Sequence, residues 1–199
     1  MIDIIDLSGD DLFYNKDRFD NGEINLCFIT GHAGSGKTTL ANQMLTENTE
    51  HIDLDELILI SDNYSIDELE EYSPLLYEYF STVGKKWYKG LTWFNSKQPS
   101  FAEYEKRMFP EFITFAKKYA SEHPFQRYII EGVALYETCS PQQFDDCAFY
   151  IKGTPMEVCM RRRKKNIKTQ EDIDWYKNSD RQLKEFRDYF QKKIYSQMK

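Results

Sequence analysis

Cysteine and histidine, the residues that most often bind zinc, are scarce in this sequence. There are only four cysteines and three histidines. The cysteines show no close-paired spacing, and no histidine lies near enough in sequence to complete a zinc motif with them. We therefore expect reduced, mostly buried thiols at Cys27, Cys139, Cys147 and Cys159.

Long hydrophobic runs and an excess of positive charge are also lacking. No apolar run approaches membrane-spanning length, and the acidic start MIDIIDLSGDD lacks the basic and apolar segments of a secretion signal. The net charge of -7 disfavours a broad nucleic-acid-binding surface. We expect a cytoplasmic protein without a membrane partner. The sequence does not indicate its oligomeric state.

Apolar residues are abundant enough for one folded domain. Hydrophobic residues make up 41% of the 199-residue chain, and no linker or repeat divides it, so residues 1–199 are predicted to form a single domain. Short apolar runs alternate with helix-prone stretches, which is typical of an α/β fold with a parallel sheet. Strands are predicted at 24–30, near 49–54, at 127–132 and at 147–153. Residues 1–22 have no assigned place, and residues 56–127 are predicted to be a helical insertion.

Local patterns predict several helix boundaries. Ser73 before Pro74 predicts an N-cap with proline in the first turn, and Gly84 predicts the end of that helix. Pro110 is predicted to kink a later helix. Three capping boxes are predicted, at Ser100 with Glu103, Thr154 with Glu157 and Thr169 with Asp172, the last opening a long C-terminal helix.

A glycine-rich segment follows the first buried strand. Residues 31–38, GHAGSGKT, fit the phosphate-binding pattern G-x-x-x-x-G-K-[ST]. In such a P-loop, backbone N–H groups surround a polyphosphate, the lysine reaches the β and γ phosphates, and the following hydroxyl ligates Mg²⁺. Lys37 and Thr38 are predicted to take these roles, and His32 is predicted to be a spacer, with a catalytic role as the alternative. The predicted nucleotide-binding residues are Gly31, His32, Ala33, Gly34, Ser35, Gly36, Lys37, Thr38 and Thr39.

Acidic residues follow two other predicted strands. If residues 53–55 are extended, Asp53 and Asp55 project to the same side at the carboxyl end of a strand, where ligands bind in open α/β sheets. One carboxylate could accept a proton from a substrate hydroxyl, with Asp53 slightly preferred, while the other holds Mg²⁺ through water. Glu131 is a further candidate for the Mg²⁺ shell. The alternatives are helix capping by Asp53 with Glu56, and a loop-capping role for Glu131.

The run MRRRKKNIK at 160–168 is the one strongly basic stretch. Residues 155–168 are predicted to form a lid, in which Arg161 or Arg162, with Lys165, closes over the transferring phosphoryl group. A solvated helix face and an RNA-binding patch are the alternatives. Aromatic residues of the insertion are expected to be packing residues or to include a stacking surface for a base, namely Tyr72, Tyr77, Tyr79, Trp87, Tyr88 and Trp93.

The order of these motifs resembles the P-loop small-molecule kinases of the nucleoside and nucleoside-monophosphate kinase superfamily. The stretch from IIEGVALY to FDDCAFYIKGTPMEVCMRRRKKN is most similar to uridine kinases. The resemblance implies a three-layer P-loop NTPase fold with a parallel sheet, a helical insertion and a lid helix, with ATP and Mg²⁺ as cofactors. HIDLDEL departs from the uridine-kinase pattern and is closer to the paired aspartates of shikimate-type, gluconate-type and zeta-toxin-like kinases.

The predicted function is ATP-dependent transfer of the γ-phosphate to a hydroxyl or phosphate of a small molecule, such as a nucleoside or nucleotide. The insertion would hold this acceptor. A zeta-toxin-like sugar-nucleotide kinase is one alternative, and a nucleotide-binding ATPase or switch that regulates a partner is another. Only the basic run supports a polynucleotide kinase. No guanine-recognition motif of the Asn-Lys-x-Asp type is present, so ATP is the default nucleotide.

Overall fold

The computed structural model describes residues 11–55, 57, 65–83 and 99–198, without the side chains of residues 66, 83 and 99–105. Several predictions from the sequence fall outside this part of the chain. They are the helix end at Gly84, the capping box of Ser100 with Glu103, and any role of Trp87, Tyr88 and Trp93.

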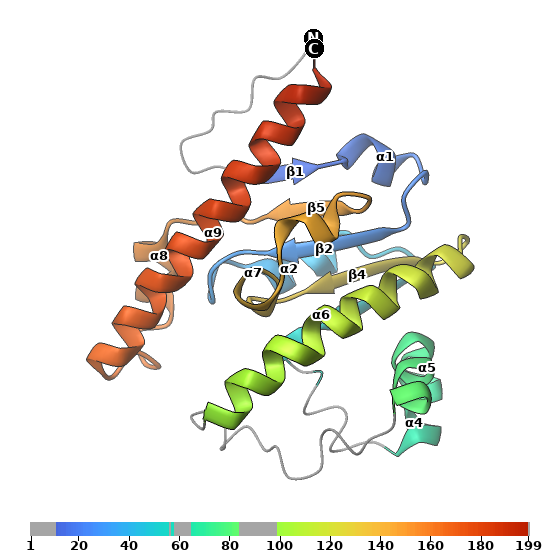
Figure 1. Cartoon of the computed structure of the whole chain (residues 1–199), viewed down its shortest axis with the longest axis horizontal. Coiled ribbons are helices and arrows are strands. Elements are labelled where there is room, and N and C mark those ends of the chain that lie inside the picture. The colour runs from blue at the N-terminus through green and yellow to red at the C-terminus, as the bar shows by residue number, and fades with distance from the viewer. Residues whose placement is uncertain (1–10, 56, 58–64, 84–98, 199) are drawn as a thin grey trace.

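A five-stranded mixed sheet forms the centre of the protein, in the order β1-β5-β2-β4-β3 (Figure 1). Four strands are parallel, and β1 pairs antiparallel with β5. The strands are β1 Leu12–Tyr14, β2 Leu26–Thr30, β3 Thr49–Asp53, β4 Arg127–Glu131 and β5 Ala148–Ile151. The α/β class and the four predicted strands are therefore confirmed.

Strand β1 was not predicted, and it corrects the view that residues 1–22 have no place. Its three residues are too few to show an alternating pattern. Pairing with β5 defines the strand, with Leu12 opposite Ile151, and the Tyr14 hydroxyl donates to the Asp145 carbonyl at 3.0 Å. Asn15, in the left-handed conformation at φ 55°, then turns the chain into α1.

Helices cover both faces of the sheet. Cys27 and Ile29 of β2 pack with the α1 and α2 side, whereas Leu26 and Phe28 pack with the larger set of helices. Figure 1 shows α6, α7 and α9 in front of the sheet and α2 behind it. The helices are α1 Lys16–Asp20, α2 Lys37–Gln43, α4 Ile66–Tyr72, α5 Pro74–Val83, α6 Pro99–Glu122, α7 Ala134–Thr138, η3 Pro141–Phe144, α8 Met156–Arg162 and α9 Gln170–Gln197.

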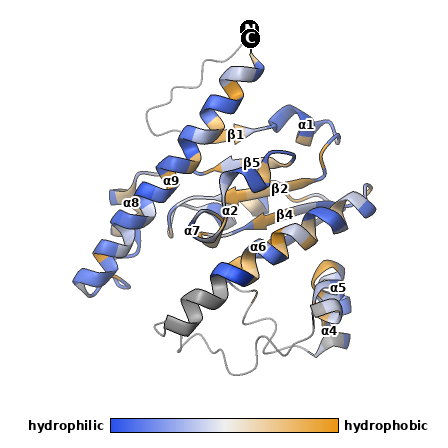
Figure 2. Cartoon of the chain, in the orientation of Figure 1, coloured by the Kyte–Doolittle hydropathy of each residue, from blue (hydrophilic) through white to orange (hydrophobic). Residues whose placement is uncertain are grey.

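The hydrophobic pattern explains these layers. Every residue of β2 is buried, because both sheet faces are covered, and Figure 2 shows β2 and β4 as hydrophobic while α9 is mostly hydrophilic. The α9 helix packs through a few aromatic residues, such as Phe190, whose ring stacks on Phe149 at 4.6 Å. Burying each such ring contributes about 1.5–3 kcal/mol. No helix in the described part of the chain is long and apolar enough to cross a membrane.

Two of the predicted helix starts are confirmed and one is wrong. The Ser73 hydroxyl accepts from the Leu76 N–H at 3.1 Å, and Thr169 forms a capping box with Asp172. However, α8 has no side-chain cap, because the Thr154 hydroxyl donates instead to the Ser35 carbonyl at 2.9 Å. The hydroxyl that was expected to cap α8 thus connects it to the glycine-rich loop.

Candidate functional site

The carboxyl ends of the four parallel strands lie at one edge of the sheet. Residue pairing places Ile29 of β2 beside Glu131 of β4, and Glu131 beside Asp53 of β3. On the other side, Thr30 pairs with Ile151 of β5. The glycine-rich loop 31–36 leaves the central strand β2 at this edge, where ligands bind in open α/β sheets.

Three glycines give the loop a conformation that other residues rarely adopt. Gly31, Gly34 and Gly36 have φ angles of 149°, 86° and 95°. A Cβ atom on Gly31 would lie 2.9 Å from the Lys152 Cβ, whereas a Cβ on Gly36 would meet nothing within 4 Å. Gly31 is therefore required by both its backbone angle and its contact with Lys152, and Gly36 by its backbone angle alone.

The loop presents backbone N–H groups without protein acceptors. The Ser35 N–H donates to the His32 carbonyl at 2.9 Å, and the first helical bond of α2 runs from the Leu40 N–H to the Gly36 carbonyl at 3.1 Å. Within the part of the chain that the structure describes, the N–H groups of Gly34 and of residues 36–39 have no acceptor. Five such donors around one loop are suited to an anion.

Three consecutive carbonyl groups of the same loop have donors from the C-terminal part of the chain. The Tyr176 hydroxyl donates to the Ala33 carbonyl at 3.1 Å. Arg162 Nη1 donates to the Gly34 carbonyl at 3.2 Å, and the Thr154 hydroxyl to the Ser35 carbonyl at 2.9 Å. Three consecutive loop carbonyls are therefore hydrogen-bonded, whereas the N–H groups of Gly34 and of residues 36–39 have no acceptor among the described residues.

Lys37 places a buried ammonium group under the loop. The residue is 7% exposed, and its Nζ donates to the His32 carbonyl at a long 3.4 Å. Thr38 and Thr39, in the first turn of α2, are exposed. A cation with one weak bond beside five free N–H groups fits a polyphosphate chemically, and the exposed Thr38 hydroxyl fits a metal ion bound to that phosphate.

The acidic residues after β3 differ in position from the sequence-based expectation. Residues 54 and 55 are helical, so Asp53 and Asp55 do not share a side through strand alternation. Asp53 Oδ1 accepts from the Asp55 N–H at 2.9 Å, as in the capping alternative. Burial raises the pKa of Asp55 although the residue as a whole is exposed; Lys37 opposes this rise and Glu131 adds to it. Asp55 is therefore close enough to Lys37 for the two charges to interact.

Glu131 is almost fully buried at the end of β4. Its Oε1 lies 3.1 Å from His51 Nε2, and the residue is 1% exposed. Within the described residues, no group of three or more His, Cys, Asp or Glu side chains could hold a metal ion alone. A Mg²⁺ ion here would need oxygen ligands from a phosphate, as Mg²⁺ commonly has.

The three consecutive arginines have different positions. Arg161 is exposed on α8, and Arg162 contacts the Gly34 carbonyl. Arg163, which was not predicted from the sequence, is close enough to Asp55 to oppose the rise that burial causes in its pKa. It also lies across Gly34, where a Cβ would be 3.0 Å from the Arg163 Cγ. Its place in the run RRRKK was the only sequence signal for it.

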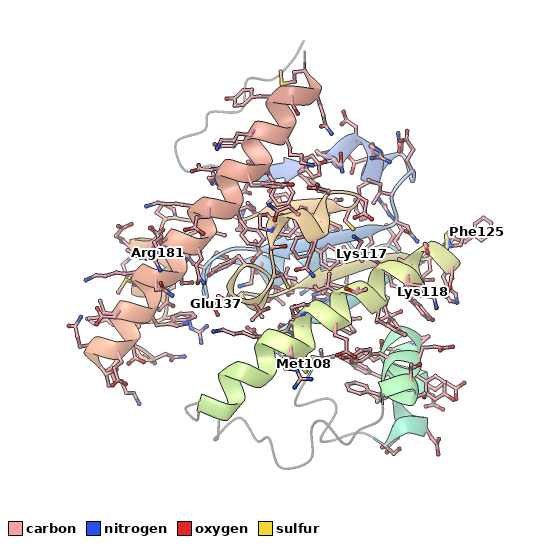
Figure 3. The ribbon with its side chains drawn as sticks, in the orientation of Figure 1. Met108, Lys117, Lys118, Phe125, Glu137 and Arg181 are labelled. Atoms are coloured by element: carbon pink, nitrogen blue, oxygen red, sulfur yellow. The ribbon has the colours of Figure 1, made fainter. Side chains whose placement is uncertain are left out.

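A cavity of about 280 Å³ adjoins Ala33 of the loop, and we call it the Asp55 cavity. Its lining includes Leu54, Asp55, Phe109, Glu137, Arg163 and Trp175. Glu137 lies between α6 and α9 in the view of Figure 3. Its aromatic lining comes from Trp175 and Tyr176 of α9 and from Phe109 of the insertion. Of the insertion tyrosines predicted to stack on a base, Tyr79 is in the core and Tyr72 is exposed.

A second cavity of about 370 Å³ lies on the other side of the loop, and we call it the Lys152 cavity. Its lining includes His32, Lys152, Pro155, Asp180, Lys184 and Arg187. His32 is 3% exposed, with Nε2 3.1 Å from Asp180 Oδ1, and its Nδ1 has no partner among the described residues. Burial lowers the pKa of His32, so the imidazole is neutral near pH 7.

A scan against protein-family models and a search of curated proteins found no match for this chain. The chemistry of this edge of the sheet is therefore inferred from its residues and their geometry.

Proposed function

We propose that the chain is an ATP-dependent phosphotransferase with a P-loop NTPase fold. The observation that carries this proposal is the set of five free N–H groups, at Gly34 and residues 36–39, beside the buried Lys37 ammonium. Together they offer directed hydrogen bonds and one positive charge at the carboxyl end of the central strand. That combination suits the β and γ phosphates of a nucleoside triphosphate.

The residues around the loop have distinct proposed roles. Lys37 neutralises charge on the β and γ phosphates, and the Thr38 hydroxyl is the protein ligand for Mg²⁺, which supplies further charge neutralisation when bound. Arg163 is the proposed lid arginine in place of Arg161 or Arg162, because it faces the Asp55 cavity. The Lys152 cavity, on the far side of His32, has room for the nucleoside of the donor.

The phosphate acceptor is proposed to bind in the Asp55 cavity. As the acceptor hydroxyl oxygen bonds to the γ-phosphorus, Asp55 takes the hydroxyl proton, and the bond from the γ-phosphorus to the bridging oxygen breaks to release ADP. Burial raises the pKa of Asp55 above that of a solvated aspartate, which makes it a better proton acceptor. Closure of 155–168 over the cavity would keep water from competing as acceptor.

The test is ATP consumption by the purified protein with Mg²⁺ and a panel of nucleosides, nucleoside monophosphates, sugars and sugar nucleotides. Acceptor-dependent ADP formation is expected, and Lys37→Met should abolish it. Lys118→Met is the matched control, since Lys118 is exposed on α6. A folded Lys37→Met protein with full activity would contradict the mechanism. Tight ATP binding without acceptor-dependent turnover would favour the alternative function, a nucleotide-dependent switch.

A further inference from the structure

We propose that Thr154, Arg162 and Tyr176 are positioning residues that hold the glycine-rich loop in its anion-binding conformation. This inference rests on the proposed function and identifies what prepares the loop for phosphate. Each residue donates to a different loop carbonyl, and the three carbonyls are consecutive, at residues 33, 34 and 35. We call these three contacts the carbonyl clamp.

The clamp determines where the loop N–H groups point. A trans peptide unit is planar, so its carbonyl and the N–H of the next residue point in opposite directions. Because Tyr176 holds the Ala33 carbonyl, the Gly34 N–H points away from α9. Because Thr154 holds the Ser35 carbonyl, the Gly36 N–H points away from Thr154. These two N–H groups are among the free donors of the loop.

Glycine makes such a clamp necessary. Gly34 and Gly36 flank two of the clamped peptide units, and glycine adopts positive and negative φ with similar ease, so these units can rotate at little cost. A rotated unit would turn its carbonyl oxygen toward the phosphate and repel it. The clamp bonds favour the orientation in which only N–H groups face the anion.

All donors of the clamp lie C-terminal to β5, over a hundred residues from the loop in sequence. The same segment holds the side chain of His32 through Asp180, which Lys184 also contacts at 2.7 Å. Docking of α8 and α9 and the phosphate affinity of the loop are therefore linked. A nucleotide should stabilise the docked helices, and weaker docking should weaken nucleotide binding by the same factor.

Two nearly isosteric substitutions test the clamp. Tyr176→Phe and Thr154→Val each remove one hydroxyl donor and retain the packing. The matched controls are Tyr189→Phe, which removes a hydroxyl bonded to Asp145 at 2.7 Å, and Thr114→Val, which removes one bonded to the Pro110 carbonyl at 2.9 Å. Neither control residue contacts the loop.

The readouts are ATP affinity with Mg²⁺ by calorimetry, and amide hydrogen exchange of residues 33–36 in the nucleotide-free protein. Each clamp variant should bind ATP about 3- to 10-fold more weakly, as expected for one lost hydrogen bond, while the controls change by less than about twofold. The clamp variants should also exchange faster at Gly34 and Gly36, and the KM for the acceptor should be unchanged.

The outcomes distinguish the two proposals. If the wild-type protein binds ATP and both clamp variants bind it equally well, the clamp inference is wrong and the proposed function stands. If the wild-type protein binds no nucleoside triphosphate, the proposed function is wrong and the inference fails with it. If the controls lose as much affinity as the clamp variants, the effect is general to α9 and α6, and the clamp has no special role.

Discussion

Alanine substitutions at Gly31 and Gly36 of the loop, and at Gly22 outside it, are expected to change stability and ATP affinity in different ways. Gly22, Gly31 and Gly36 all have positive φ, but only Gly31 has close neighbours, with an added Cβ 2.9 Å from Lys152 Cβ and Ser35 Oγ. Gly22 lies in the turn after α1, and an added Cβ there or at Gly36 would meet nothing within 4 Å.

The expected magnitudes follow from these contacts. Gly22→Ala and Gly36→Ala should each lower the free energy of unfolding by about 1–2 kcal/mol, the cost of a left-handed alanine. Gly31→Ala adds a collision with Lys152, the residue after β5, and with the Ser35 hydroxyl, so its total cost should be about 2–6 kcal/mol, combining backbone strain with overpacking. Urea denaturation measures these differences through the transition midpoint at constant slope.

The effects of these variants on ATP affinity should follow a different order from their effects on stability. Gly36→Ala disfavours the left-handed backbone angle that orients the free N–H groups of residues 36–39. We therefore expect ATP affinity to fall more than about tenfold, or about 1.4 kcal/mol. Gly22→Ala should bind as the wild type does. If Gly31→Ala costs no more stability than Gly22→Ala, the loop does not lie against Lys152 as described. If Gly36→Ala binds ATP normally, these N–H groups are not the phosphate site.

Three further predictions concern charged groups of the site. Asp55→Asn should lower turnover about 10²- to 10⁴-fold, yet raise the melting temperature at pH 7, because burial raises the pKa of Asp55 and makes its ionised form unfavourable in the folded state. Burial lowers the pKa of His32, so its contribution to stability is present above the unfolded pKa of about 6.5 and is lost as the pH falls. His32→Asn should therefore flatten the loss of stability between about pH 7 and pH 5, measured by urea unfolding. Arg163→Ala should lower kcat more than Arg161→Ala, since only Arg163 lines the Asp55 cavity.

Each of these predictions has a result that contradicts it. An Asp55→Asn enzyme that retains full turnover would exclude Asp55 as the base. If the stability of the His32→Asn protein has the same pH dependence as that of the wild type, other groups cause the loss of stability at low pH. Equal kcat values for the two arginine variants would remove Arg163 from the proposed lid.

The sequence predicted those elements that depend on residues close together in the chain. The apolar runs of β2, β4 and β5 mark buried strands because helices cover both faces of the sheet, and the N-caps at Ser73 and Thr169 depend only on residues within one turn. Strand β1 could not be predicted, because its three residues become a strand only by pairing with β5. The Thr154 prediction was wrong for a similar reason, since a carbonyl more than a hundred positions away binds its hydroxyl.

The sequence by itself determined the chemistry of the loop: its glycines permit the left-handed angles, and Lys37 follows the last of them. Tertiary structure alone decided which acidic residue and which arginine face that loop. Asp55 and Arg163 are brought together because β3 ends at the same sheet edge as β2, and α8 returns to it after β5. The carbonyl clamp was likewise invisible in the sequence, because a hydrogen bond between distant residues depends on the path of the chain between them.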